Sequence, residues 1–130
     1  MKKLVLVLML VFCASAHADG LTDLDADTIK AAGIPVYISA VFVMGNKDVG
    51  FRFATSDAPD NVKEWYREQL ANWSLFDNYG SWILYDGKPG AGMSDIMATN
   101  QVAVQKNENL PEWHSLPEDM TTEIVIMVVK

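Results

Sequence analysis

One amphipathic helix set between strand-like runs most constrains the fold of this chain. From Asp60 to Trp73, apolar and aromatic side chains recur every three or four residues, while charged side chains occupy the other side. Pro59 suits the first helical turn, and Ser56 or Asp57 is a suitable N-cap. The aromatic stripe is typical of a helix packed on a sheet, and a platform for stacking carbohydrate stays open as the alternative.

Short runs rich in β-branched and aromatic residues lie on both sides of this helix and predict strands. The runs cover residues 36–44, 49–54, 81–85, 102–106 and 123–129. Turn residues between the first two runs, at 45–48, favour a β-hairpin. Strands interrupted by one helix, without strict alternation, indicate an α+β fold with an antiparallel sheet of about five strands, in the order β-β-α-β-β-β.

A short helix is expected before the first strand. Asp25 or Asp27 can cap it, it runs through Ala32, and Gly33 can adopt the left-handed conformation that ends a helix.

Three of the predicted strands are apolar at both odd and even positions: 36–44, 82–85 and 124–129. One main helix shields one face, so the second face needs cover from the short helix, the long loops or a second subunit. Self-association into a homo-oligomer is therefore one of our hypotheses.

The first 18 residues have the features of a secretory signal peptide. Two lysines precede an apolar run, Leu4 to Ala14, that is too short to span a bilayer, and Ala16-His17-Ala18 offers small residues for cleavage. A retained membrane anchor is the alternative. We expect cleavage after Ala18, one domain over residues 19–130, and a periplasmic or extracellular protein. Cleavage would remove Cys13, the single cysteine of the sequence, and with it disulfide and thiolate chemistry.

The charge balance excludes several classes of partner. The sequence has 17 acidic and 10 basic residues, a formal net charge of −7, and the loss of two lysines with the leader would make it −9. The remaining cations are scattered singly and form no basic stripe. We expect neither nucleic acid nor, after cleavage, a membrane as partner, and we expect no cofactor.

One acidic segment contains part of a metal-binding motif. Asp23, Asp25 and Asp27 have the alternate spacing that opens a calcium loop. Thr28 stands where that loop needs glycine, and Ile34 stands where it needs glutamate. The sequence therefore predicts no metal site, and helix capping explains these carboxylates better.

His114 is the single histidine left after cleavage and the one side chain suited to act as a general base near neutral pH. It lies in a loop with a proline on each side, and neither a nucleophile nor an orienting carboxylate can be identified for it. A structural or surface histidine is favoured. The alternative is a small hydrolase that uses His114 with Glu112 or Asp119.

The segment Ala54-Thr-Ser-Asp-Ala-Pro-Asp-Asn-Val-Lys-Glu-Trp-Tyr-Arg-Glu-Gln-Leu70 resembles small exported bacterial α+β domains of unknown function. In these domains a strand leads into a helix with the pattern S/T-x-D-x-P-x-x-V-x-x-W-Y-x-x-x-L. The resemblance covers about the central third of the chain and brings no catalytic residues with it. It implies a small exported domain rather than an enzyme.

Two functions are compatible with these observations. The favoured one is a non-catalytic envelope protein that binds a protein partner or a small ligand through its sheet face and the loops 86–101 and 108–119. Trp82, Tyr85 and Trp113 are its predicted contacts, because tryptophan and tyrosine often anchor interfaces. The other is the hydrolase that would use His114.

Overall fold

In the computed structural model, residues 20–107 and 120–129 are described. The helices of this part of the chain are α2 (Asp23–Ala31), α3 (Pro59–Gln69) and α4 (Met93–Met97). The strands are β1 (Val41–Asn46), β2 (Gly50–Thr55), β3 (Ser74–Asn78), β4 (Ser81–Tyr85), β5 (Gln101–Lys106) and β6 (Thr122–Met127).

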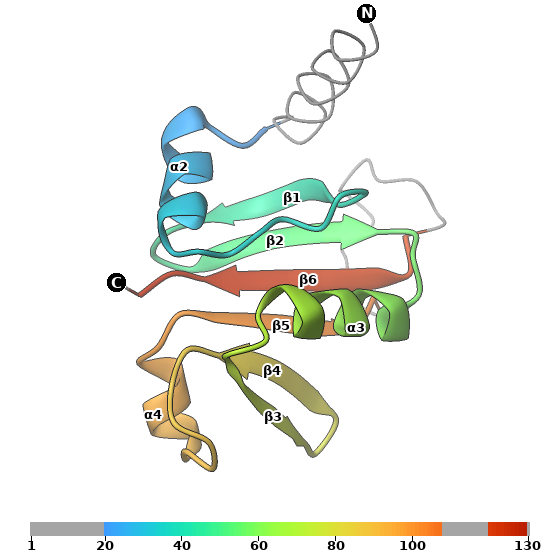
Figure 1. The fold of residues 1–130 in the computed structure, drawn as a ribbon. Helices are drawn as coiled ribbons and strands as arrows, with labels where there is room; N and C mark the ends of the chain where they lie inside the picture. Colours follow the sequence, from blue (N-terminus) through green and yellow to red (C-terminus); the bar gives the residue numbers. More distant parts are fainter. Residues whose placement is uncertain (1–19, 108–119, 130) are drawn as a thin grey trace, which may run out of the picture.

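The strands form one antiparallel sheet in the order β1-β2-β6-β5-β4-β3 (Figure 1). The predicted α+β class is confirmed, but the sheet has six strands rather than about five. The additional strand is β3, whose Ser-Leu-Phe-Asp-Asn sequence has two apolar residues among polar ones. β3 pairs with β4 across the turn Tyr79-Gly80, and both turn residues have positive φ, 52° and 79°, as tight hairpin turns require.

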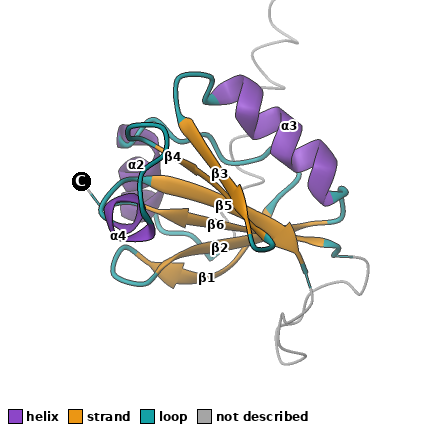
Figure 2. Ribbon diagram, turned by 90° about the horizontal axis from the view of Figure 1, so that it is seen from below, coloured by secondary structure: helices purple, strands orange, loops and turns teal. Residues whose placement is uncertain are grey.

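Alternate residues divide the sheet into two faces, and we call the face that carries α3 the inner face. Its side chains form one buried core with residues of α2 and α3, and Figure 2 shows α3 lying along one side of the sheet. The sheet contributes Phe51, Phe53, Leu84, Val102, Val104, Ile124 and Ile126, and the helices contribute Ile29, Val62, Tyr66 and, just after α3, Leu70. The inner face is thus a continuous apolar layer.

The aromatic stripe of α3 belongs to this core. Tyr66 is fully buried, and Trp65 and Trp73 are half-buried and packed against the core cluster. Trp65 makes edge-to-face contacts with Tyr66 and Tyr37, with ring centroids 4.9 and 5.2 Å apart. These contacts favour core packing over a carbohydrate platform.

Both helix caps differ from the prediction. Thr22 caps α2, and its Oγ1 accepts the N–H of Asp25 at 3.1 Å, so the prediction of Asp25 or Asp27 was wrong. The predicted end of this helix is confirmed, since Gly33 has φ +76°. α3 begins at Pro59 with Ala58 as its N-cap and without a side-chain cap, so neither Ser56 nor Asp57 caps it.

The strand boundaries differ mainly at β1. β1 begins at Val41 instead of Val36, because the preceding residues are used elsewhere: the N–H of Ile34 donates to Ile29, that of Tyr37 to the Tyr66 hydroxyl and that of Ala40 to Tyr37. The predicted hairpin is confirmed, but its turn is residues 47–49 rather than 45–48, because Gly45 and Asn46 belong to β1. Asn46 Oδ1 accepts the N–H groups of Asp48 and Val49 at 2.9 and 3.2 Å. β4 has the predicted bounds, and α4 was not predicted.

We call the opposite side of the sheet the outer face, and α4 covers one corner of it. Ile96 of α4 packs against Ile83 and Tyr85 of β4 and forms a second, smaller apolar cluster. In the part of the chain that is described, no helix is both long and apolar enough to cross a membrane.

Candidate functional site

The two described residues predicted as partner contacts are buried. Trp82 is 6% exposed and belongs to the inner-face core, where Lys63 Nζ lies 6.0 Å from its ring centroid. Tyr85 is 1% exposed, and its hydroxyl donates to the carbonyl oxygen of Lys88 at 2.7 Å and accepts the N–H of Ala91 at 3.3 Å. Both rings are therefore used for internal packing rather than presented to a partner.

The remaining predicted site residues lie outside the described residues. Trp113, His114, Glu112 and Asp119 belong to residues 108–119, and so does the second predicted binding loop. The hydrolase hypothesis based on His114 thus stays a prediction.

The first predicted binding loop, 86–101, is partly helical. Besides the Tyr85 contacts, Ser74 Oγ donates to the carbonyl oxygen of Gly87 at 2.7 Å, and Gln101 Nε2 donates to that of Ile96 at 3.2 Å. Met93 and Met97 of α4 remain 44% and 49% exposed. Most of the segment is exposed, and it is held to the fold by these hydrogen bonds and by the buried side chain of Ile96.

Among residues 20–107 and 120–129, no three His, Cys, Asp or Glu side chains are grouped so that they could hold a metal ion. Asp23 and Asp25 lie in the first turn of α2, where their negative charge interacts favourably with the positive end of the helix dipole.

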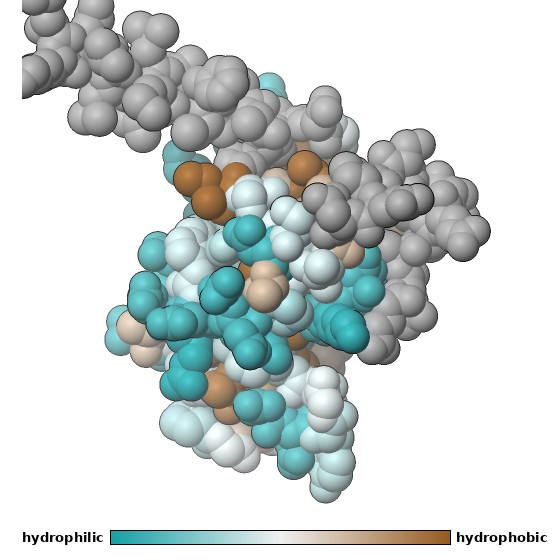
Figure 3. Space-filling view, turned by 90° about the vertical axis from the view of Figure 1, so that its right-hand side faces the viewer, coloured by the Kyte–Doolittle hydropathy of each residue, from teal (hydrophilic) through white to brown (hydrophobic). Residues whose placement is uncertain are grey.

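A cluster of hydroxyl groups surrounds Asp57, at the end of the molecule where β2 ends and α3 begins. The surface at this end is mainly hydrophilic, and the larger hydrophobic patches lie near the top of the view in Figure 3. Asp57 Oδ2 accepts hydrogen bonds from the hydroxyls of Tyr37 at 2.6 Å and Ser39 at 3.1 Å. Ser39 Oγ also bonds to Thr55 Oγ1 at 2.7 Å. The hydrogen bond to Asp57, together with burial, raises the pKa of Tyr37 to about 12.

Next to this cluster, hydrogen bonds join residues 34–40 to α3. The buried hydroxyl of Tyr66 donates to the carbonyl oxygen of Pro35 at 3.0 Å and accepts the N–H of Tyr37 at 3.2 Å. Thr55, Asp57 and Tyr66 are three of the residues that carry the family resemblance. Their contacts give these three residues a structural role in this fold.

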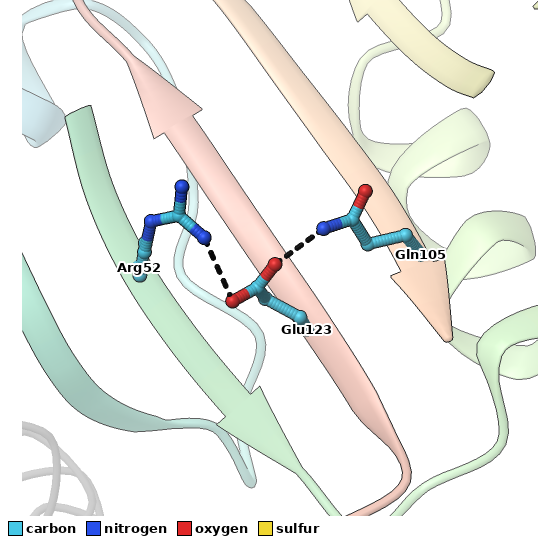
Figure 4. A network of polar contacts seen from close by, with 3 residues as sticks. All are labelled: Arg52, Gln105 and Glu123. Atoms are coloured by element: carbon cyan, nitrogen blue, oxygen red, sulfur yellow. Dashed lines mark hydrogen bonds and ion pairs between the residues drawn. The ribbon is translucent and has the colours of Figure 1, made fainter. Parts of the chain in front are cut away.

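A second polar network lies across the central strands on the outer face. Arg52 Nη1 donates to Glu123 Oε2 at 3.1 Å, and Gln105 Nε2 donates to Glu123 Oε1 (Figure 4). The three residues come from β2, β6 and β5, which are adjacent in the sheet. Both carboxylate oxygens of Glu123 are thereby engaged from opposite sides.

The members of this network differ in exposure. The side chain of Glu123 is 7% exposed, whereas that of Arg52 is 46% exposed. The second terminal nitrogen of Arg52 points away from Glu123 in Figure 4. The accessible part of the ion pair is therefore its cation.

Apolar side chains surround this cation. In the sheet register Arg52 lies between Met44 of β1 and Val125 of β6, and Val41 and Met127 belong to the same face. Met44 is 39% exposed and the other three are half-buried. A Cβ atom added to Gly50 would come within 2.4 Å of Met127 Sδ, so Met127 covers the start of β2. The outer-face site is the set of Val41, Met44, Arg52, Glu123, Val125, Met127 and Gln105.

Sequence reasoning did not identify this site. Arg52 and Glu123 are 71 residues apart, and they approach because β2 and β6 pair. The one local indication is the period-two pattern of β2, in which Arg52 lies on the face opposite Phe51 and Phe53.

Compared with known proteins, the chain matches no family model, no curated protein and no solved structure. The family resemblance noted from the sequence thus stays a prediction.

Proposed function

We propose that this chain is an exported, non-catalytic binding domain that engages a protein partner through the outer-face site. The observation that supports this proposal is the exposed Arg52 guanidinium, held by a buried carboxylate and flanked by partly exposed apolar side chains. Arginine within an apolar surrounding is enriched among the residues that dominate interface energetics.

The position of the site on strands favours recognition. β2, β6 and β5 are central strands, each hydrogen-bonded on both sides, so the backbone that carries Arg52, Glu123 and Gln105 is rigid. A surface of this kind is already ordered before a partner arrives, and binding loses less conformational entropy.

The chemistry of the site favours binding over catalysis. Glu123 has both oxygens occupied by Arg52 and Gln105, and a carboxylate in that state does not serve as a general base without losing a hydrogen bond. The partly buried cluster around Asp57 is likewise occupied with contacts that hold residues 34–40.

Site-specific photocrosslinking in the native cell envelope tests the proposal. A benzophenone amino acid at Met44 would report on the outer-face site, and the same group at Glu68, an exposed position of α3, is the matched control. We expect a discrete adduct from position 44 and none from position 68. An adduct at twice the protein's own mass would identify a second copy as the partner instead. Equal labelling from both positions, or none at 44, would contradict the proposal.

Export is tested on the same material. Intact-mass spectrometry of protein from the envelope fraction is expected to give a chain that begins at Asp19. An uncut chain that begins at Met1 and stays in the cytosol would refute this part of the proposal.

A further inference from the structure

Resting on the proposed function, we infer that the protein partner presents a side-chain carboxylate to the guanidinium of Arg52 and places apolar side chains against Met44 and Val125. The unused donors of Arg52, its charge and its apolar surroundings favour such a partner.

The donors of Arg52 are only partly used. A guanidinium has five N–H groups in a planar fork. Nη1 donates to Glu123, and among the described residues the remaining N–H groups have no acceptor. The second terminal nitrogen points away from Glu123 (Figure 4), so an incoming carboxylate can be bound without breaking the existing ion pair.

Glu123 keeps the guanidinium in position for this contact. Gln105 holds the second oxygen of Glu123, which fixes the carboxylate from the other side. An arginine that is already ordered by a buried carboxylate loses little rotamer entropy on binding. Arg–carboxylate contacts of this type are also directional, because two parallel N–H groups fit two oxygens.

The charge of the site selects an anionic group. On the outer face of β1, β2, β5 and β6, the ionisable residues are Arg52 and Glu123, and the exposed one of these is Arg52. A second copy would bring one Arg52 towards another and one acidic chain towards another, each with a net charge of −7 before and −9 after loss of the leader. Like charges disfavour that arrangement, whereas a foreign carboxylate complements the site.

The apolar surroundings favour a protein over a small free acid. Met44 and Val125 lie directly on either side of Arg52 in the register, and Met44 is 39% exposed. A methionine side chain adapts its shape to different apolar groups. A carboxylate that carries apolar neighbours covers both flanks, and a small acid such as acetate covers neither.

Capped tripeptides test this inference directly. The probe is acetyl-Leu-Glu-Leu-amide, and acetyl-Leu-Gln-Leu-amide is the matched neutral peptide. Binding is followed through the Nε–H signal of Arg52 and the backbone amides of Met44 and Val125 in nitrogen-15 NMR spectra. We expect saturable shifts with the glutamate peptide, with a dissociation constant in the millimolar range of about 1 mM typical of so small a contact, and at least tenfold weaker binding of the glutamine peptide.

Variants separate the role of Arg52 from a general loss of structure. R52Q should abolish the shifts, and R52K should weaken binding because an ammonium group lacks the planar fork. R67Q, which removes an exposed arginine from α3, is the control and should bind like the wild type. If R52Q spectra lose their dispersion, the comparison of R52K with R67Q still decides the matter.

Three results would overturn the inference. They are equal binding of both peptides, unchanged binding by R52K, and binding of acetate as tight as that of the glutamate peptide, which would identify a small acid as the ligand. Crosslinking from position 44 that persists in R52Q would refute the carboxylate contact and leave the proposed function standing. Absence of crosslinking from position 44 in a chain that keeps Arg52 would refute the proposed function itself.

Discussion

The two faces of the sheet use the same strands for different purposes. On β6, Ile124 and Ile126 enter the inner core and are fully buried, while Val125 and Met127 point to the outer face and are half-buried. The inner face has two helices against it, whereas α4 covers one corner of the outer face. An apolar run in the sequence therefore does not require an apolar core on both sides. On the outer face it surrounds an ion pair instead.

The largest expected difference between the faces comes from truncating neighbouring residues of β6. Ile124→Ala removes a side chain that is 0% exposed and should lower the free energy of unfolding by about 2–5 kcal/mol. Val125→Ala, one position along, should cost about 1 kcal/mol or less, because its site is partly open to water. Urea denaturation measures both. Similar losses for the two variants would mean that the outer face is packed as tightly as the inner one.

The second prediction concerns the hydroxyl cluster at the edge of the inner face. Tyr37→Phe removes the hydrogen bond to the Asp57 carboxylate and should lower stability by about 1.5–3 kcal/mol, the range for hydrogen bonds to charged groups. Tyr79→Phe is the control, because Tyr79 is 93% exposed and should change stability little.

The raised pKa of Tyr37 adds a dependence on pH. The phenol keeps its proton in the folded protein up to about 12, whereas in the unfolded chain it ionises near 10.0. Its contribution is complete below pH 10.0 and is lost as the pH rises from there through about 12. Urea denaturation across that window should give a steeper fall in stability for the wild type than for Tyr37→Phe. Equal slopes would show that Tyr37 is not the residue responsible.

The third prediction tests the ion pair of the outer face. A double-mutant cycle of Arg52→Gln and Glu123→Gln should give a coupling energy of about 1 kcal/mol or less, because Arg52 is 46% exposed and water screens the pair. Arg67→Gln combined with Glu123→Gln is the control cycle and should be additive, since no ion pair or hydrogen bond joins these two described residues. A coupling of several kcal/mol would mean that the pair is far more shielded than its exposure indicates, and would weaken the case for a binding role.

Local patterns predicted the regular parts of this fold well. The period-two alternation of β2, the bounds of β4 and the left-handed Gly33 all follow from local chemistry, and each was expected from the sequence. β3 and α4 were missed because each has only five residues, too few to show a clear period, so tertiary contacts stabilise them.

The differences at the caps and at the site have a common cause. Asp57 does not cap α3 because its carboxylate bonds to Tyr37 and Ser39, and those partners are 20 and 18 residues away. Arg52 and Glu123 are likewise brought together by strand order. Trp82 and Tyr85 were expected at a surface. They lie on β4, where core residues cover both faces of the sheet, so both side chains are buried. Contacts between residues far apart in the sequence give no local pattern from which they could be predicted.

The smallest expected effect is that of a charge at the rim of the inner face. Lys63 Nζ lies 6.0 Å from the ring centroid of Trp82, at the limit of a cation–π contact, so Lys63→Met should cost about 0.5 kcal/mol or less while keeping the apolar stem. Thermal unfolding at low and high salt measures it, and the difference from wild type should shrink as salt screens the charge. If Lys63→Met lowers the free energy of unfolding more than Arg52→Gln does, the comparison of the two faces is reversed. The cation that contributes most to stability would then lie at the rim of the inner face and not on the outer face.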